Sequence, residues 1–120
     1  MKKRTLVLGA SLNPNKYSNI AIKRLIERNI ETLAIGIRKG SIGNVIIETE
    51  KKPFTNIDTV TLYLNAERQK AYYDYIISLQ PRRVIFNPGT ENPTFIKLLK
   101  ENNIDSEIAC TLVLLSTKQY

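Results

Sequence analysis

The stretch that decides the fold covers residues 5–37 and reads TLVLGASLNPNKYSNIAIKRLIERNIETLAIGI. Residues 5–8 (TLVL) and 32–37 (TLAIGI) are apolar at nearly consecutive positions, which is the pattern of strands buried on both faces. A loop over residues 9–17 follows the first run, and Ser18 stands where a helix N-cap is expected. Apolar residues then recur at helical spacing, namely Ala21, Ile22, Leu25 and Ile26. We therefore predict a strand, an amphipathic helix and a second strand, which together form a βαβ unit.

The middle of the chain continues this alternation. Composition and periodicity predict a loop at residues 38–44 (RKGSIGN), a short extended piece at 45–47, a charged connection at 48–56 and a third strand at 59–64 (TVTLYL). Asn65 is the predicted cap of the next helix, which ends at Pro81. One face of that helix is formed by Tyr72, Tyr75, Ile76 and Leu79, and their helical spacing favours packing as the role of the tyrosines.

The last third of the chain contains a strong helix start at Asn92 and Pro93. Asn accepts the free backbone N–H groups of a first turn, and Pro has no N–H to leave unsatisfied there. The predicted elements are a fourth strand at residues 83–86 (RVIF), a turn at 87–89, a helix at 93–101, a weak fifth strand at 107–109 and a terminal helix or extended tail at 111–117.

Alternation of buried strands with helices predicts the α/β class. With 120 residues, we expect a single Rossmann-like domain covering residues 1–120, doubly wound, with a mainly parallel five-stranded sheet and helices on both faces. Ligands in such folds bind outside the carboxyl ends of the strands, at the point where the strand order reverses. The loops after the first, second and fourth strands are therefore the candidate binding loops.

The amino-acid composition excludes several classes of function. Eighteen Lys and Arg against eleven Asp and Glu give a net charge of +7, which favours anionic partners. The absence of histidine excludes mechanisms of the Ser-His-Asp and Cys-His types, and the single cysteine excludes an intramolecular disulfide. The N-terminus Met-Lys-Lys-Arg leads into too short an apolar run for a signal peptide, and no run is long enough to span a membrane. We expect a cytoplasmic protein.

The first loop, from Gly9 to Ser18, lies between a strand and a helix N-terminus, where backbone N–H groups and the helix dipole favour a diphosphate. The pattern G-x-G-x-x-G is not met, because Ser11 and Pro14 replace its second and third glycines. The alternative interpretation is that Gly9 and Pro14 are only turn residues.

The residues of the second loop do not fit an NAD-binding site. An NAD site places Asp or Glu at the end of the second strand to bind the ribose hydroxyls, whereas Gly36, Ile37, Arg38 and Lys39 stand here. Two cations suit an adenosine whose ribose carries a phosphate, as in NADP or coenzyme A. The alternative is a solvated charge pair.

Two further features have a structural interpretation beside a functional one. A lone cysteine such as Cys110 is more often a small core residue than a nucleophile. The loop at residues 87–92 either lines the ligand crevice or is only a helix-capping turn.

Four features together carry a family resemblance. They are GAS-x-NP-x-KYS before the first helix, Lys-Gly-x-Ile-Gly after the second strand, Gly-x-x-Asn after the fourth strand, and a cysteine at the last strand. In this order they resemble the small CoA-binding domain proteins, which are similar to the N-terminal CoA-binding domain of succinyl-CoA ligase alpha subunits. The resemblance extends over about residues 4–115.

The resemblance implies which residues bind the cofactor. The CoA diphosphate would lie on the first motif, formed by Gly9, Ala10, Ser11, Asn13, Pro14, Lys16, Tyr17 and Ser18. The adenosine 3′-phosphate would meet Arg38, Lys39 and Gly40. Ligase activity is not implied, because the histidine that carries phosphate in those ligases is absent.

Three functions follow, in order of preference. The first is non-catalytic or regulatory binding of coenzyme A or an acyl-CoA, with no catalytic residue and no metal. The second is a minimal NADP-dependent reductase, although no tyrosine is followed four residues later by lysine. The third is a basic interaction or nucleic-acid-binding module, which is less favoured because the cations are scattered. A homodimer through an exposed edge strand or helix is compatible with all three.

Overall fold

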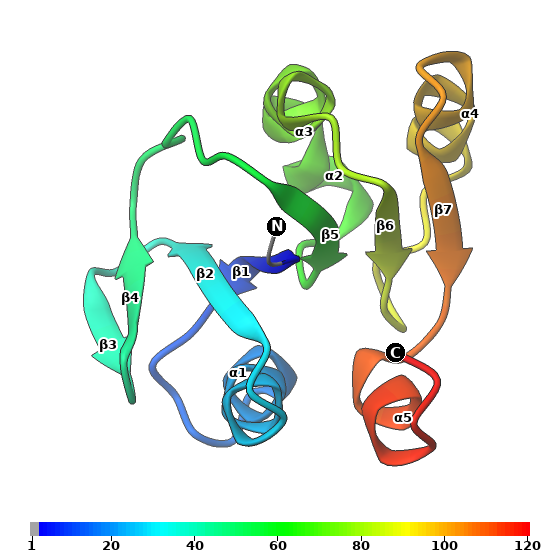
Figure 1. The fold of residues 1–120 in the computed structure, drawn as a ribbon. Coiled ribbons are helices and arrows are strands. Elements are labelled where there is room, and N and C mark those ends of the chain that lie inside the picture. The colour runs from blue at the N-terminus through cyan, green and yellow to red at the C-terminus, as the bar shows by residue number, and fades with distance from the viewer. Residues whose placement is uncertain (1–2) are drawn as a thin grey trace.

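Strand β1 (Arg4–Ala10) lies inside a sheet with the order β3-β4-β2-β1-β5-β6-β7 (Figure 1). The computed structural model describes residues 3–120, so Met1 and Lys2 of the cationic N-terminus lie outside the described residues. The other strands are β2 (Glu31–Gly36), β3 (Gly40–Ile42), β4 (Val45–Glu48), β5 (Ile57–Leu62), β6 (Arg83–Phe86) and β7 (Asp105–Ile108). All neighbouring strands pair in parallel except β3 and β4.

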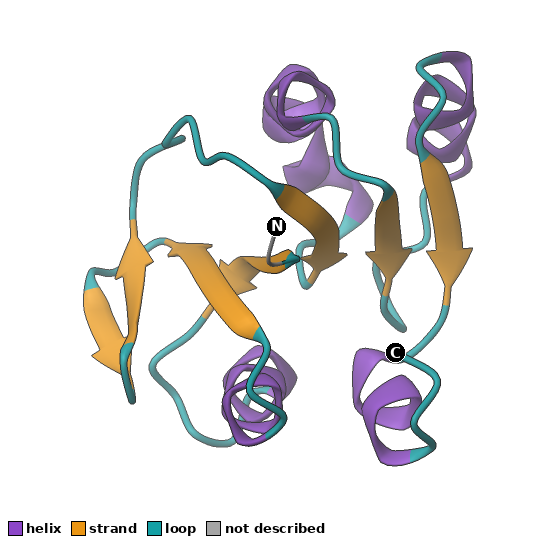
Figure 2. Ribbon diagram, viewed as in Figure 1, coloured by secondary structure: helices purple, strands orange, loops and turns teal. Residues whose placement is uncertain are grey.

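The helices cover both faces of this sheet (Figure 2). They are α1 (Tyr17–Glu27), α2 (Ala66–Gln69), the 3₁₀ turn η1 (Lys70–Tyr72), α3 (Tyr73–Leu79), α4 (Pro93–Glu101) and α5 (Thr111–Ser116). Helices α1 and α5 lie on one side of the sheet, and α2, α3 and α4 lie on the other. The predicted α/β, doubly wound fold with helices on both faces is confirmed.

Each face has its own apolar core. Leu6, Leu8 and Phe86 belong to the cluster under α3 and α4, whereas Val7 and Ile22 belong to the cluster under α1. Successive residues of β1 therefore contribute to opposite cores, as expected for a strand buried on both faces. This arrangement explains why the strand is apolar at consecutive positions.

The predicted number of strands is wrong, because the structure describes seven strands between residues 3 and 120 instead of five. The predicted loop at residues 38–44 contains β3 and the turn of a β3–β4 hairpin, in which Ile42 pairs with Val45. Gly43 takes φ +58° in the two-residue turn, a conformation in which glycine is not strained. The expected extended piece at residues 45–47 is β4, which also pairs with β2.

The predicted helix after Asn65 is also different. It is divided into α2, η1 and α3. Gln69 on α2 is fully buried and bonds to the loop after β6, while Ile76 on α3 packs in the core under the sheet. Strand β6 and helix α4 have the predicted bounds, and the tail after Cys110 is the helix α5.

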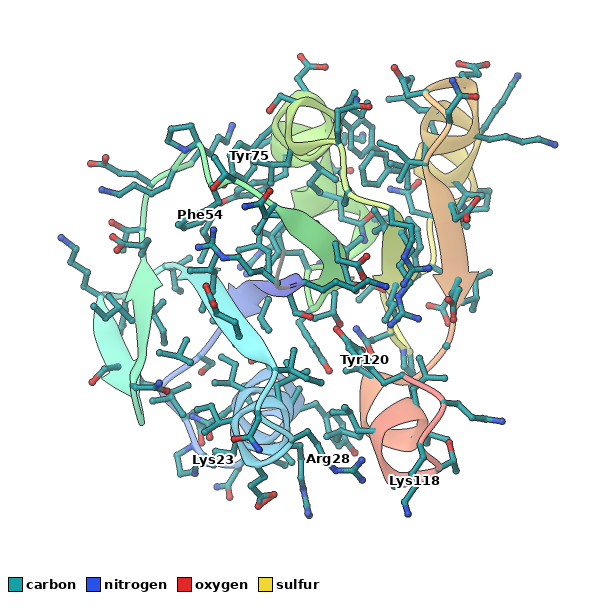
Figure 3. All side chains as sticks on the ribbon, viewed as in Figure 1. Lys23, Arg28, Phe54, Tyr75, Lys118 and Tyr120 are labelled. Atoms are coloured by element: carbon teal, nitrogen blue, oxygen red, sulfur yellow. The ribbon has the colours of Figure 1, made fainter. Side chains whose placement is uncertain are left out.

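Tyr120 packs against the sheet near α5 (Figure 3). Its hydroxyl lies 2.5 Å from the Thr5 hydroxyl, and its ring lies 4.6 Å from the guanidinium carbon of the buried Arg83. Among residues 3–120, no helix has the length and apolar character needed to cross a membrane.

Candidate functional site

A cleft of about 760 Å³ opens at the carboxyl ends of β1, β2, β5 and β6. The chain order reverses here, because β1 lies between β2 on one side and β5 on the other. This is the switch point at which the loops of a doubly wound sheet separate and leave room for a ligand. The sequence therefore predicts the position of the cleft correctly.

The loop after β1 forms the floor of the cleft and is held by its own polar groups. Gly9 takes φ +96°, and a Cβ there would lie 3.0 Å from the backbone carbon of Tyr63. The Ser11 hydroxyl accepts a hydrogen bond from the Asn13 N–H, and the buried Asn19 donates its amide N–H to the Ser11 carbonyl at 2.9 Å. Contacts within the protein thus determine the shape of this loop.

The predicted N-cap at Ser18 is wrong. Helix α1 begins at Tyr17, Lys16 occupies the N-cap position, and no side chain caps the first turn. The Asn13 carbonyl accepts a hydrogen bond from the Lys16 N–H, so a turn of the loop starts the helix. Ser18 lies inside the first turn and lines the cleft. The uncapped N-terminus of this 11-residue helix presents backbone N–H groups and a positive dipole end to the cleft.

The end of β2 approaches β1 closely. A Cβ at Gly36 would lie far inside 3.0 Å of the Ala10 carbonyl oxygen, so only glycine fits. Arg38 follows on the cleft wall and is exposed. No Asp or Glu stands between Gly36 and Arg38, so this wall offers positive charge where a ribose-binding carboxylate would otherwise be expected.

The structure brings most of the predicted binding residues together. Those that line the cleft are Gly9, Ala10, Ser11, Asn13, Lys16, Tyr17, Ser18 and Arg38. Pro14, Lys39 and Gly40 are not among its described lining residues. Pro14 is exposed in the loop, Lys39 is exposed directly before β3, and Gly40 begins β3 and packs against the Leu12 side chain.

Sequence reasoning missed one entire wall of the cleft. It consists of residues after β5, namely Tyr63, Leu64, Asn65, Arg68 and Tyr72. The available signal was Asn65, which follows a buried strand as a helix cap and accepts a hydrogen bond from the Arg68 N–H at 2.9 Å. The loop after β6, expected to be either a wall or a capping turn, supplies Pro88, Gly89 and Thr90 to the cleft.

A buried amide joins these two walls. Gln69 is fully buried, and its amide N–H groups donate to the carbonyls of Leu64 at 2.8 Å and Thr90 at 2.7 Å. Its oxygen accepts from the Asn92 amide at 2.9 Å, and Asn92 also caps α4 by accepting from the Phe95 N–H. The loops after β5 and β6 are therefore fixed relative to each other.

Tyr63 is the cleft residue whose protonation is most affected by the fold. Burial raises the pKa of Tyr63 to about 12, although hydrogen bonding with Thr111 and Thr61 acts in the opposite direction. The phenol is thus protonated at neutral pH and is no general base. Cys110 is a free, partly buried thiol before α5 and is not among the described lining residues of the cleft.

The charge of the cleft has one sign. Lys16, Arg38 and Arg68 line it, and no Asp or Glu is found among its described lining residues. An unpaired cluster of cations in a concave site, beside a helix N-terminus, attracts an anionic ligand. The rest of the lining is apolar or neutral, with Leu12, Ile37 and Leu64 beside the cations.

The family model for a CoA binding domain matches residues 3–116. The protein belongs to this CoA-binding domain family. The expected resemblance to small CoA-binding domain proteins is thereby confirmed.

Several solved structures have the same fold as this protein. The crystal structure of an uncharacterized protein is 43% identical to this CoA-binding domain, covers 100% of the chain and 99% of its own length, and superposes with a TM-score of 0.95. A Thermus thermophilus protein matches at 18% identity with a TM-score of 0.83 over 99% of this chain and 91% of its own. A conserved hypothetical protein from Pyrococcus furiosus matches at 23% identity with a TM-score of 0.80, over 94% of this chain and 98% of its own. No curated protein matches.

Proposed function

We propose that this CoA-binding domain holds coenzyme A, or an acyl-CoA, through its ADP and 3′-phosphate moiety and carries out no reaction of its own. The observation that carries this proposal is the cation-lined cleft, with no carboxylate among its described lining residues, at the uncapped N-terminus of α1. Such a site is suited to two separate phosphate groups.

We assign the two phosphate groups to the two loops after β1 and β2. The diphosphate belongs over residues 9–18, where the N-terminus of α1 and Lys16 face the cleft. The 3′-phosphate belongs beside Arg38, on the wall formed after β2. The missing carboxylate on this wall supports a phosphorylated ribose, because a carboxylate would repel the phosphate.

A binding or regulatory role is supported by the side chains that could otherwise act as acids or bases. The chain has no histidine. The lining residues found in the part of the chain that the structure describes include no carboxylate, and burial raises the pKa of the Tyr63 phenol to about 12, so that it is protonated at neutral pH. Specificity would thus come from the phosphates and the adenosine.

Calorimetry and thermal unfolding with CoA, acetyl-CoA, dephospho-CoA, NADPH and NADH at one salt concentration test the proposal. We expect CoA and acetyl-CoA to bind most tightly and dephospho-CoA to bind clearly more weakly. At about 100 times its Kd, a bound ligand stabilises the native state by roughly 2.7 kcal/mol, which is measurable. Tighter binding of NADPH than of CoA would favour the minimal reductase instead. Binding of none of these ligands would leave an interaction role for the basic surface.

A further inference from the structure

Arg68 is a cleft cation for which the sequence suggested no role. It lies in the first turn of α2, on the wall that follows β5, and its side chain is exposed to the cleft. The neighbouring acid does not neutralise it, because Glu67 pairs with Lys70 at 3.0 Å. No ion pair within residues 3–120 includes Arg68. Its positive charge is therefore available to a ligand.

The backbone that carries Arg68 is fixed from three sides. Asn65 accepts the Arg68 N–H at 2.9 Å, and the next residue, Gln69, bonds to the loop after β6 through the Thr90 carbonyl. From the segment between β4 and β5, Lys51 donates to the Ala71 carbonyl at 2.5 Å. Because this backbone is already fixed, no loop has to become ordered when Arg68 binds an anion, which favours affinity.

Lys51 and its neighbours, in the segment between β4 and β5, contact this wall from outside the cleft loops. The Lys51 ammonium lies 5.1 Å from the ring centroid of Tyr72, which lines the cleft one turn after Arg68. Tyr75 donates its hydroxyl to the Lys52 carbonyl at 2.5 Å, and Figure 3 shows Tyr75 near Phe54 of the same segment. The wall is thus held by a long-range connection in addition to its own helix.

The sheet places Arg68 opposite Arg38. Arg38 follows β2 and Arg68 follows β5, and these two strands flank β1. The ends of β2 and β5 lie two strand spacings apart, roughly 10 Å, and both arginines line the cleft between the loops that follow these ends. Lys16 lies on the loop between them, at the helix N-terminus.

We propose that Arg68 and Arg38 grip the same phosphate monoester from opposite walls, so that Arg68 is a specificity-determining residue for 3′-phosphorylated ligands. This inference rests on the proposed function. A monoester is nearly a dianion at neutral pH with three terminal oxygens, enough to accept hydrogen bonds from two guanidinium groups and to offset their mutual repulsion. The diphosphate already has the N–H groups of α1.

The test compares Arg68→Ala with the wild type for CoA and for dephospho-CoA, by calorimetry at fixed salt. We expect Arg68→Ala to weaken CoA by roughly 10-fold or more, in line with the loss of a hydrogen-bonded charge partner, and dephospho-CoA by less than about 3-fold. Lys70→Ala is the matched control, because Lys70 is an exposed cation of the same segment that is paired with Glu67 and does not line the cleft. It should change neither affinity.

A double variant adds an independent criterion. If both arginines bind one phosphate, the effects of Arg38→Ala and Arg68→Ala on CoA should not add, since sites that share a partner are coupled. Equal losses for CoA and dephospho-CoA in Arg68→Ala would place Arg68 on the base or the diphosphate and overturn the inference, as would no loss for either. Failure of the wild type to bind CoA would instead refute the proposed function. Unchanged thermal unfolding of the free Arg68→Ala variant shows that the fold is intact.

Discussion

Two adjacent cations after β2 differ in their relation to the cleft. Arg38 lines it, whereas Lys39 is exposed beside the start of β3 and is not among its described lining residues. From the sequence, both residues are predicted to bind the 3′-phosphate, because both lie in a predicted loop at residues 38–44 in which either side chain could turn towards a phosphate. The β3–β4 hairpin removes that freedom, since Gly40 already pairs with Ile47.

We therefore expect Arg38→Ala to weaken CoA by about 10-fold or more while changing dephospho-CoA little, because a hydrogen-bonded charge partner of the 3′-phosphate is lost. Lys39→Ala is the neighbouring control and should weaken CoA by less than about 3-fold, as expected for a screened surface charge. Calorimetric titration of both ligands with each variant and with the double variant measures the difference. A larger loss in Lys39→Ala than in Arg38→Ala would move the 3′-phosphate towards the hairpin.

At the scale of elements, two asparagines cap helices, and they differ in burial and in the number of hydrogen bonds that they make. Asn65 is exposed and caps α2 through the Arg68 N–H. Asn92 is buried, caps α4 through the Phe95 N–H, and also donates to the Gln69 oxygen and the Tyr73 hydroxyl. The sequence predicts both caps, since each Asn precedes an apolar periodic segment. Only the structure shows that one of them also connects the elements around the cleft.

Replacing each of these asparagines by alanine should lower the free energy of unfolding by a different amount. Asn65→Ala should destabilise the fold by about 1 kcal/mol, the usual value of an exposed cap. Asn92→Ala should cost about 2–4 kcal/mol, because the lost cap is joined by a buried Gln69 oxygen that has lost its donor. Urea unfolding at equilibrium measures both free energies. Equal losses would show that the buried amide network adds no stability.

At the scale of the whole molecule, the two ends of the sheet differ in charge. At the end opposite the cleft, acids and bases are paired: Arg4 with Glu31 at 2.8 Å, and Arg82 with Asp58 at 2.9 Å. At the carboxyl ends, the cations of the cleft have no acid among the described lining residues. The ion pairs that support the fold are therefore separate from the cations to which the proposed function assigns ligand binding.

Asp58 provides a pH test of this separation. Burial alone would raise the pKa of Asp58, but hydrogen bonds from Arg82 and Thr59 and the charge of Arg82 outweigh burial, and the pKa is lowered. A carboxyl whose pKa is lower in the folded than in the unfolded chain stabilises the fold above the unfolded value of about 3.9. That contribution is lost as the pH falls through the folded-state pKa.

We expect Asp58→Asn to reduce the free energy of unfolding at pH 7 by about 0.5–1 kcal/mol, a small value because Arg82 is half exposed. Below about pH 4 the wild type should approach the variant in stability. Urea unfolding between pH 2 and pH 7 follows both proteins. A constant difference across this range would contradict the assignment to Asp58. Binding of CoA at pH 7 should be the same in both, because the pair lies at the opposite end of the sheet.

The overall fold follows from the sequence to a large extent. The consecutive apolar runs in residues 5–37 are sufficient for the central βαβ unit, because strands buried on both faces need apolar residues at every position. Strand β6 and helix α4 have their predicted bounds because Asn92 and Pro93 determine a helix start locally. The hairpin was missed because strands of three and four residues are too short for a period, although Gly43 and Asn44 are a turn signal.

By itself, the sequence determined the α/β class, the loop after β1, the cation after β2 and the family resemblance, since each depends on residues that are adjacent in the chain. Only the tertiary structure decided that Arg68 and Tyr72 lie on the same cleft as Arg38 and Lys16. It also decided that α1 starts without a side-chain cap. The physical reason is that the sheet order brings β5 beside β1, and such pairing over a long sequence separation leaves no local pattern.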